Sequence, residues 1–126
     1  MLIRSEAKCE PFTANDGCNI IELMHPKNLP DSSAAALNFS LAIAEVDIGK
    51  ETYHHVLAQN EVYYLLAGEG EVHIDGESAA VVSGDAVLIP AGSEQWIRNT
   101  GEVVLRFAAI VSPPWTAEGD RLVEPS

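Results

Sequence analysis

The chain has 126 residues, of which 47% are hydrophobic, which suits one domain with a buried core. Nineteen acidic residues against seven basic ones give a formal net charge of −12. This charge repels a phosphate backbone and an anionic membrane, and no Lys/Arg cluster offsets it, so we expect neither nucleic acid nor membrane as a partner. Because the chain shows no signal-peptide pattern and no apolar stretch long enough to span a membrane, we expect a cytoplasmic protein.

From Cys18 onward, short apolar runs alternate with turn residues about every eight to twelve positions, a pattern typical of an all-β sandwich or barrel. The predicted strands are 19–23, 38–48, 51–57, 61–66, 70–75, 78–82, 86–89, 95–99 and 102–111. Asp75-Gly76 predicts a two-residue hairpin, because Gly takes a positive φ at little cost. We expect a single domain over residues 1–126, with an N-terminal arm at 1–37, a barrel core at about 38–112 and a C-terminal tail at 113–126 laid over the barrel.

Two stretches carry the most information about function. The first runs from Gly49 to Gly68, and the second runs from Gly84 to Asn99. They resemble the two signature motifs of the cupin superfamily, written G-x5-H-x-H-x3,4-E-x6-G and G-x5-P-x-G-x2-H-x3-N. The chain looks like the small single-domain cupins that are often called mannose-6-phosphate-isomerase-like. This resemblance implies an all-β fold, the double-stranded β-helix or jelly-roll cupin barrel.

The motif histidines are only partly present. With His55 as the first motif histidine every spacing is met, but Leu57 stands at the second histidine position. With His54 as the first, Val56 stands there instead. The histidine of the second motif is replaced by Gln95. The resemblance therefore implies a metal-binding set that has lost two of its four ligands.

In cupins the three histidines and the glutamate bind a divalent metal inside the barrel. The candidate metal ligands that remain are His55 or His54, Glu61 and Gln95. An aliphatic side chain donates nothing, and a Gln oxygen is a poorer donor than imidazole for Zn, Fe or Ni. We therefore expect a divalent ion (Zn, Mn, Fe or Ni) to be bound weakly or not at all.

Alternation along a strand points His54 and His55 to opposite faces, so only one of them faces the barrel interior; the spacing favours His55 without deciding. If Glu61 faces inward without a metal, burial raises its pKa and makes it a candidate general acid or base; alternatively it lies hydrated at the barrel mouth. Tyr63 shares the face of Glu61 and is either a packing residue with a bonded hydroxyl or a catalytic one. His25, before Pro26, is interpreted as a surface residue.

Our first hypothesis is a small-molecule-binding cupin with a partly depleted metal site. The alternative is an enzyme, either a metal-dependent isomerase or oxygenase acting on a small organic or sugar-like substrate, or a metal-free acid/base catalyst that uses Glu61. A third hypothesis is a structural or interaction subunit. We also expect a homodimer, since cupins frequently pair through their sheets and exposed edge strands need cover.

Overall fold

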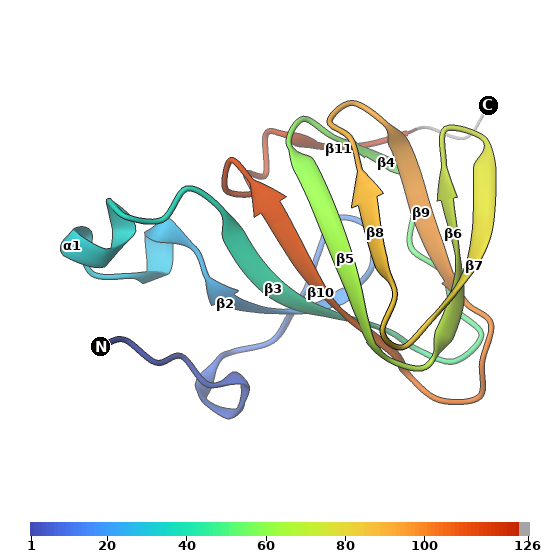
Figure 1. Ribbon diagram of the computed structural model, residues 1–126, viewed down its shortest axis with the longest axis horizontal. Helices are drawn as coiled ribbons and strands as arrows, with labels where there is room; N and C mark the ends of the chain where they lie inside the picture. The colour runs from blue at the N-terminus through green and yellow to red at the C-terminus, as the bar shows by residue number, and fades with distance from the viewer. Residues whose placement is uncertain (124–126) are drawn as a thin grey trace.

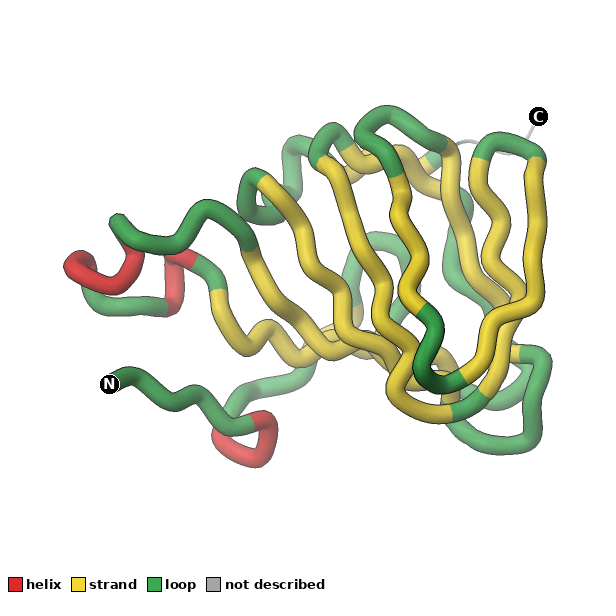
Figure 2. The backbone as a smooth tube through the Cα atoms, viewed as in Figure 1, coloured by secondary structure: helices red, strands yellow, loops and turns green. Residues whose placement is uncertain are grey.

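Two antiparallel sheets face each other and close into a double-stranded β-helix, or jelly-roll, barrel (Figure 1). The fold is taken from a computed structural model, which describes residues 1–123. The strands are β1 (Phe12–Thr13), β2 (Asn19–Met24), β3 (Ser40–Val46), β4 (His55–Leu57), β5 (Asn60–Ala67), β6 (Glu69–Ile74), β7 (Glu77–Val82), β8 (Ala86–Ile89), β9 (Glu94–Asn99), β10 (Leu105–Ser112) and β11 (Asp120–Leu122). The helices η1 (Glu6–Lys8), η2 (Pro26–Asn28) and α1 (Asp31–Ala34) are single turns that all precede β3 (Figure 2).

The strand order is β1-β2-β3-β10-β5-β8 in one sheet and β11-β4-β9-β6-β7 in the other. Strands from the expected N-terminal arm thus extend the first sheet, and β11 from the expected tail forms an edge of the second. The chain crosses between the two sheets, for example from β4 to β5 and from β8 to β9. Residues far apart in the sequence therefore meet inside the barrel. Within residues 1–123 no helix has the length and apolar character needed to span a membrane.

The predicted strand pattern is confirmed over most of its length. The hairpin at Asp75-Gly76 is also confirmed: β6 and β7 pair directly from Ile74 to Glu77, and both turn residues have positive φ. The strand predicted at 51–57 is wrong in its first half, where only Glu51 forms an isolated bridge. The reason is that Thr52 bonds β9 through its hydroxyl, which accepts from the Ile97 N–H at 3.0 Å, and so interrupts a regular ladder.

The barrel interior is filled by the inward side chains of both sheets. Across the first sheet, Ala42, Ala109, Tyr63 and Val87 form one row that spans β3, β10, β5 and β8. The second sheet contributes Val72, Val81 and Ile97 to the same core. Gly70 of β6 is required here, because a Cβ at this position would lie 2.7 Å from the Arg98 carbonyl oxygen. Buried polar side chains, among them His55, Glu61 and Gln95, lie inside the same barrel.

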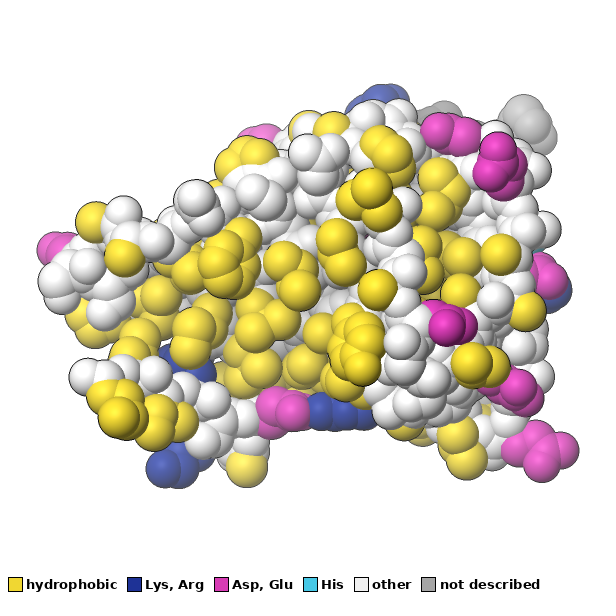
Figure 3. Space-filling view, in the orientation of Figure 1, with side chains coloured by type: hydrophobic (Ala, Val, Ile, Leu, Met, Phe, Trp, Pro, Cys, Tyr) yellow, Lys and Arg dark blue, Asp and Glu magenta, His cyan; other side chains and the backbone are white. Residues whose placement is uncertain are grey.

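The outer face of the first sheet is also apolar. Two rows cross it from strand to strand: Leu41, Ile110, Val62 and Leu88 form one, and Ile21, Ile43, Ala108, Tyr64 and Ala86 form the other. Figure 3 shows this surface as a broad hydrophobic area over these strands. An antiparallel sheet with one solvated face normally alternates apolar with polar residues. This face departs from that pattern.

Candidate functional site

His55 is a buried residue inside the barrel with carboxylates on both sides of its ring. It begins β4, pairs in register with Gln95 of β9, and is 3% exposed. The neighbouring His54 lies outside, with its side chain 47% exposed, because successive residues of an extended chain point to opposite sides. His54 stacks on Trp96 at a ring-centroid distance of 4.7 Å. Of the two histidines that the sequence left open, His55 is the one that reaches the interior.

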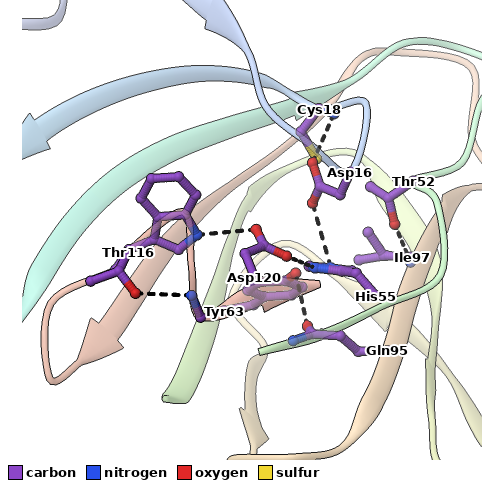
Figure 4. Close-up of polar contacts among 11 residues, drawn as sticks. Asp16, Cys18, Thr52, His55, Tyr63, Gln95, Ile97, Thr116 and Asp120 are labelled. Atoms are coloured by element: carbon purple, nitrogen blue, oxygen red, sulfur yellow. Dashed lines mark hydrogen bonds and ion pairs between the residues drawn. The ribbon is translucent and has the colours of Figure 1, made fainter. Parts of the chain in front are cut away.

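Two aspartates from opposite ends of the chain hold the imidazole of His55 (Figure 4). The Nδ1 atom lies 2.8 Å from Asp120 Oδ1, and Nε2 lies 3.5 Å from Asp16 Oδ2. Asp120 also accepts a hydrogen bond from the Trp115 indole N–H at 3.1 Å, and Asp16 accepts from the Cys18 backbone N–H at 3.0 Å. A carboxylate can only accept, so the Nδ1 atom of His55 carries the proton.

Glu61, Tyr63 and Gln95 lie beside this cluster. Glu61 and Tyr63 point inward from β5, and both are buried. The Tyr63 hydroxyl donates to Gln95 Oε1 at 3.2 Å, and its ring packs on Phe107, so it has the bonded hydroxyl of a packing residue. Within residues 1–123, three buried atoms of the site have no hydrogen-bond partner: Glu61 Oε1, His55 Nε2 and Gln95 Nε2. Buried polar atoms without partners are costly and therefore rare, so these atoms are poised to bind something further.

The surroundings shift the pKa values of the central groups. Burial raises the pKa of Glu61 to about 7, although the charge of His55 and the nearby Gln95 amide, which does not reach hydrogen-bond geometry with Glu61 Oε1, both lower it. Burial alone would lower the pKa of His55, but the Asp120 hydrogen bond and the charges of Asp16, Asp120 and Glu61 outweigh it, so the pKa is raised. Near neutral pH, Glu61 is therefore able to give or take a proton, and the neighbouring carboxylates stabilise the charged form of His55.

A cavity of about 60 Å³ opens next to these groups. Its walls come from both sheets, the N-terminal segment and the C-terminal segment. The lining residues are Phe12, Ala14, Asp16, Ile20, Glu22, Ser40, Ala42, His55, Leu57, Glu61, Ala109, Val111, Trp115 and Asp120. Apolar walls with a few polar groups at one end are typical of a small-molecule site.

The residues present do not fit the histidine-rich metal set that the motif resemblance implies. Leu57, at the position of the second motif histidine, lines the cavity and has no donor atom. The one oxygen of the Gln95 side chain already accepts the Tyr63 hydroxyl. His55 Nε2 faces Asp16 Oδ2 at 3.5 Å and Nδ1 faces Asp120 at 2.8 Å, and these carboxylates raise the pKa of the imidazole, so a metal would have to displace a stabilised proton. Among residues 1–123, no group of three or more His, Cys, Asp and Glu side chains is arranged to hold an ion.

Sequence reasoning missed Asp16 and Asp120, which no motif marks. Asp16 lies in a turn before β2, and Asp120 begins a three-residue edge strand, so both reach His55 only through the tertiary fold. His25 is a correction: we expected a surface residue, but it is 4% exposed. Its Nδ1 atom accepts from the Lys27 N–H, and its Nε2 atom lies 2.7 Å from the Trp115 carbonyl oxygen. His25 thus helps to position the segment that carries Trp115.

Comparison with known protein families gives one clear match. The Cupin_2 model, which describes the cupin domain, matches residues 42–111. This range includes His55, Glu61, Gln95 and most of both sheets. It leaves out Asp16 and Asp120.

Individual relatives agree with this match. An uncharacterized protein of Methanocaldococcus jannaschii is 33% identical over 118 residues, which are 93% of this chain and 90% of that protein. An oxalate-binding protein of Thermotoga maritima is 37% identical over 51 residues, 40% of this chain and 42% of that protein. The crystal structure of a predicted oxalate decarboxylase from Thermotoga maritima superposes with a TM-score of 0.72 at 22% identity, covering 90% of this chain and 99% of that one. That likeness supports the fold.

Proposed function

The chain belongs to the cupin-domain family, and we propose that it binds a small organic molecule in the cavity beside His55 and Glu61. The observation that carries this proposal is the set of buried atoms without hydrogen-bond partners, Glu61 Oε1 above all, at the end of a cavity with apolar walls. A ligand with a hydrogen-bond donor would give Glu61 Oε1 the partner that it lacks, and its hydrocarbon part would cover the apolar walls of the cavity. Binding by these side chains needs no transition metal.

A screen of small molecules with a cavity-filling variant tests the proposal. The library contains neutral, cationic and anionic compounds of a few heavy atoms, and a rise in melting temperature identifies hits. Ala42 lines the cavity, so Ala42→Leu should abolish binding by filling it. Ala79 is exposed on β7, so Ala79→Leu adds the same volume elsewhere and should leave binding unchanged. If the hits bind Ala42→Leu as tightly as the parent protein, the ligand lies elsewhere and the proposal is wrong.

Acid–base catalysis by Glu61 is a second candidate function. It is favoured by the unpartnered Oε1 atom and by the pKa of about 7, close to the optimum for a group that transfers protons at neutral pH. In that case a molecule found in the screen is converted, and Glu61→Gln abolishes conversion even at ligand concentrations that saturate the variant. A metal-dependent isomerase or oxygenase is less well supported, because the donor set described above lacks two imidazoles.

We further propose that a second copy of the chain covers the apolar outer face of the first sheet. The two rows that cross this face contain no charged residue, although the chain carries a net charge of −12. Glu45 and Arg106, which extend the same face of β3 and β10, are paired with each other at 3.3 Å, and Arg106 also pairs with Glu6 of the N-terminal segment. A large uncharged apolar area on a strongly charged protein is typical of an interface. The same face of a second copy is equally uncharged, so the two faces can meet without burying a charge.

A further inference from the structure

The cavity has an excess of negative charge that the contacts of His55 do not remove. Four carboxylates line it, those of Asp16, Glu22, Glu61 and Asp120, whereas His55 is the one basic residue in the lining. Asp120 at 2.8 Å and Asp16 at 3.5 Å already offset the charge of His55. Within residues 1–123, Glu22 and Glu61 take part in no ion pair, so the charge of Glu22, and that of Glu61 once it ionises above its pKa of about 7, is left for a ligand to neutralise.

Glu61 marks where the ligand must make contact. Its side chain lies almost entirely out of water, with the residue 7% exposed, and Oε1 has no hydrogen-bond partner within the described chain. An ionised carboxylate only accepts hydrogen bonds, so its partner must bring an N–H or O–H group. A hydrogen bond in which the donor or the acceptor is ionised is about twice as strong as a neutral one. With the carboxylates of Asp16 and Asp120 close by, a positively charged donor fits better than a neutral one.

We infer that the ligand is a small organic cation, a protonated amine or amidinium, whose nitrogen donates to Glu61 and whose hydrocarbon part lies on the apolar walls. This inference rests on the proposed function and names the chemical class of the bound molecule. Ile20, Leu57 and Val111 provide the hydrocarbon surface. Trp115 and Phe12 add aromatic rings, whose faces attract cations. The cavity of about 60 Å³ holds roughly four or five atoms the size of a water molecule, so the cation is small.

The same charges disfavour a dicarboxylate such as oxalate in this chain. A carboxylate ligand needs a cation to bind against, and no Lys or Arg lines the cavity. His55 alone faces two aspartates and Glu61. The chain is 37% identical over 51 residues to an oxalate-binding protein, but the cavity described here selects the opposite charge.

Three probes of similar size and different charge test the inference: n-butylammonium, 1-butanol and butyrate, each titrated calorimetrically at pH 8. We expect n-butylammonium to bind about 10- to 100-fold more tightly than 1-butanol, and butyrate not to bind. Glu61→Gln keeps the shape of the side chain and removes its charge, so it should reduce the affinity for n-butylammonium to that for 1-butanol. Glu102→Gln removes the same charge from an exposed loop and should change neither affinity.

Each other outcome has a definite meaning. The inference is overturned if 1-butanol binds as tightly as n-butylammonium or if butyrate binds best, although cavity binding as such would stand. It is also overturned if n-butylammonium does not bind at all, and the wider screen with Ala42→Leu then decides the proposed function separately. Unchanged affinity of Glu61→Gln for n-butylammonium would remove Glu61 as the contact. Should Glu61→Gln fail to fold, the relative affinities of the parent protein for n-butylammonium, 1-butanol and butyrate still test the inference.

Discussion

The imidazole of His55 and the carboxylate of Asp120 form a buried hydrogen bond between residues 65 positions apart, Nδ1 to Oδ1, at 2.8 Å. Their side chains are 4% and 5% exposed. Because Asp120 also accepts from the Trp115 indole, this contact attaches the C-terminal segment, which forms part of the cavity wall, to β4. We therefore expect the position of the C-terminal segment and the protonation of His55 to be coupled through Asp120.

Asp120→Asn should destabilise the protein by about 3 kcal/mol, because it removes one charge from a buried pair and leaves the other without its partner. The pKa of His55 should also fall, since its main hydrogen bond to a charged acceptor is lost. Guanidinium unfolding measures the first effect, and an NMR titration of the imidazole measures the second. Asp31→Asn, in the exposed first turn of α1, is the control and should change stability by less than about 0.5 kcal/mol. If Asp120→Asn behaves like the control, the bond to His55 does not stabilise the fold.

Most of the fold could be predicted from the sequence because its signals are local. Alternating apolar residues and Gly or Pro turns act over a few positions, and the hairpin at Asp75-Gly76 requires only the positive φ of its two turn residues. The short edge strands β1 and β11 were missed, since two or three residues carry no periodic pattern. Their pairing depends on neighbours that the fold brings together.

The candidate site was predicted only in part, for the same reason. His55, Glu61 and Gln95 belong to spaced motifs, and they converge as the spacing suggested. Asp16 and Asp120 come from segments outside those motifs and occupy both sides of the imidazole. The motif alone therefore predicts His55 as a metal ligand, whereas the structure shows its ring between the carboxylates of Asp16 and Asp120. The burial of His25 was missed because a turn residue next to Pro was assumed to be exposed.

Stability should decrease as pH rises from about 4.5 to above 7. The pKa of Glu61 is about 7 in the folded state against an ordinary value of 4.5, so the folded state holds this proton more tightly, and raising the pH removes up to about 3 kcal/mol. His55 acts in the same direction: its raised pKa gives stability that is full below 6.5 and is lost as pH passes its folded pKa. Unfolding by guanidinium at pH 5, 6, 7 and 8 measures the slope.

Glu61→Gln isolates the contribution of Glu61 to that slope. The variant has no ionisable group at this position, so its stability should exceed that of the parent protein at pH 8 and should vary less between pH 5 and 7. Glu102→Gln, on the surface, should follow the parent profile. Parallel profiles for Glu61→Gln and the parent protein would show that Glu61 titrates alike in the folded and unfolded states.

Added metal should not stabilise the parent protein, but it should stabilise a variant in which the missing imidazoles are restored. Zn, Mn, Fe and Ni salts should leave the melting temperature of the parent protein unchanged, because His55 is held by two carboxylates and Leu57 has no donor. Leu57→His combined with Gln95→His supplies two imidazoles beside His55 and Glu61. At an ion concentration of 100 times Kd the double variant should gain about 2.7 kcal/mol. One metal ion per chain in the parent protein purified without added metal, lost on Glu61→Ala, would contradict our reading of the donor set.

Leu88→Glu should prevent dimer formation without unfolding the protein. Leu88 is 67% exposed on the outer face of β8, so a charge there costs the single chain little, but in a dimer it would be buried against an apolar surface. We expect the parent protein to sediment as a dimer and the variant to dissociate with a Kd at least about 10-fold higher. Val103→Glu is the matched control, since Val103 is 56% exposed in the loop before β10 and belongs to neither apolar row. A parent protein that remains monomeric at every concentration would leave the apolar face without the proposed partner, and a dimer that persists in Leu88→Glu would place the interface on another surface.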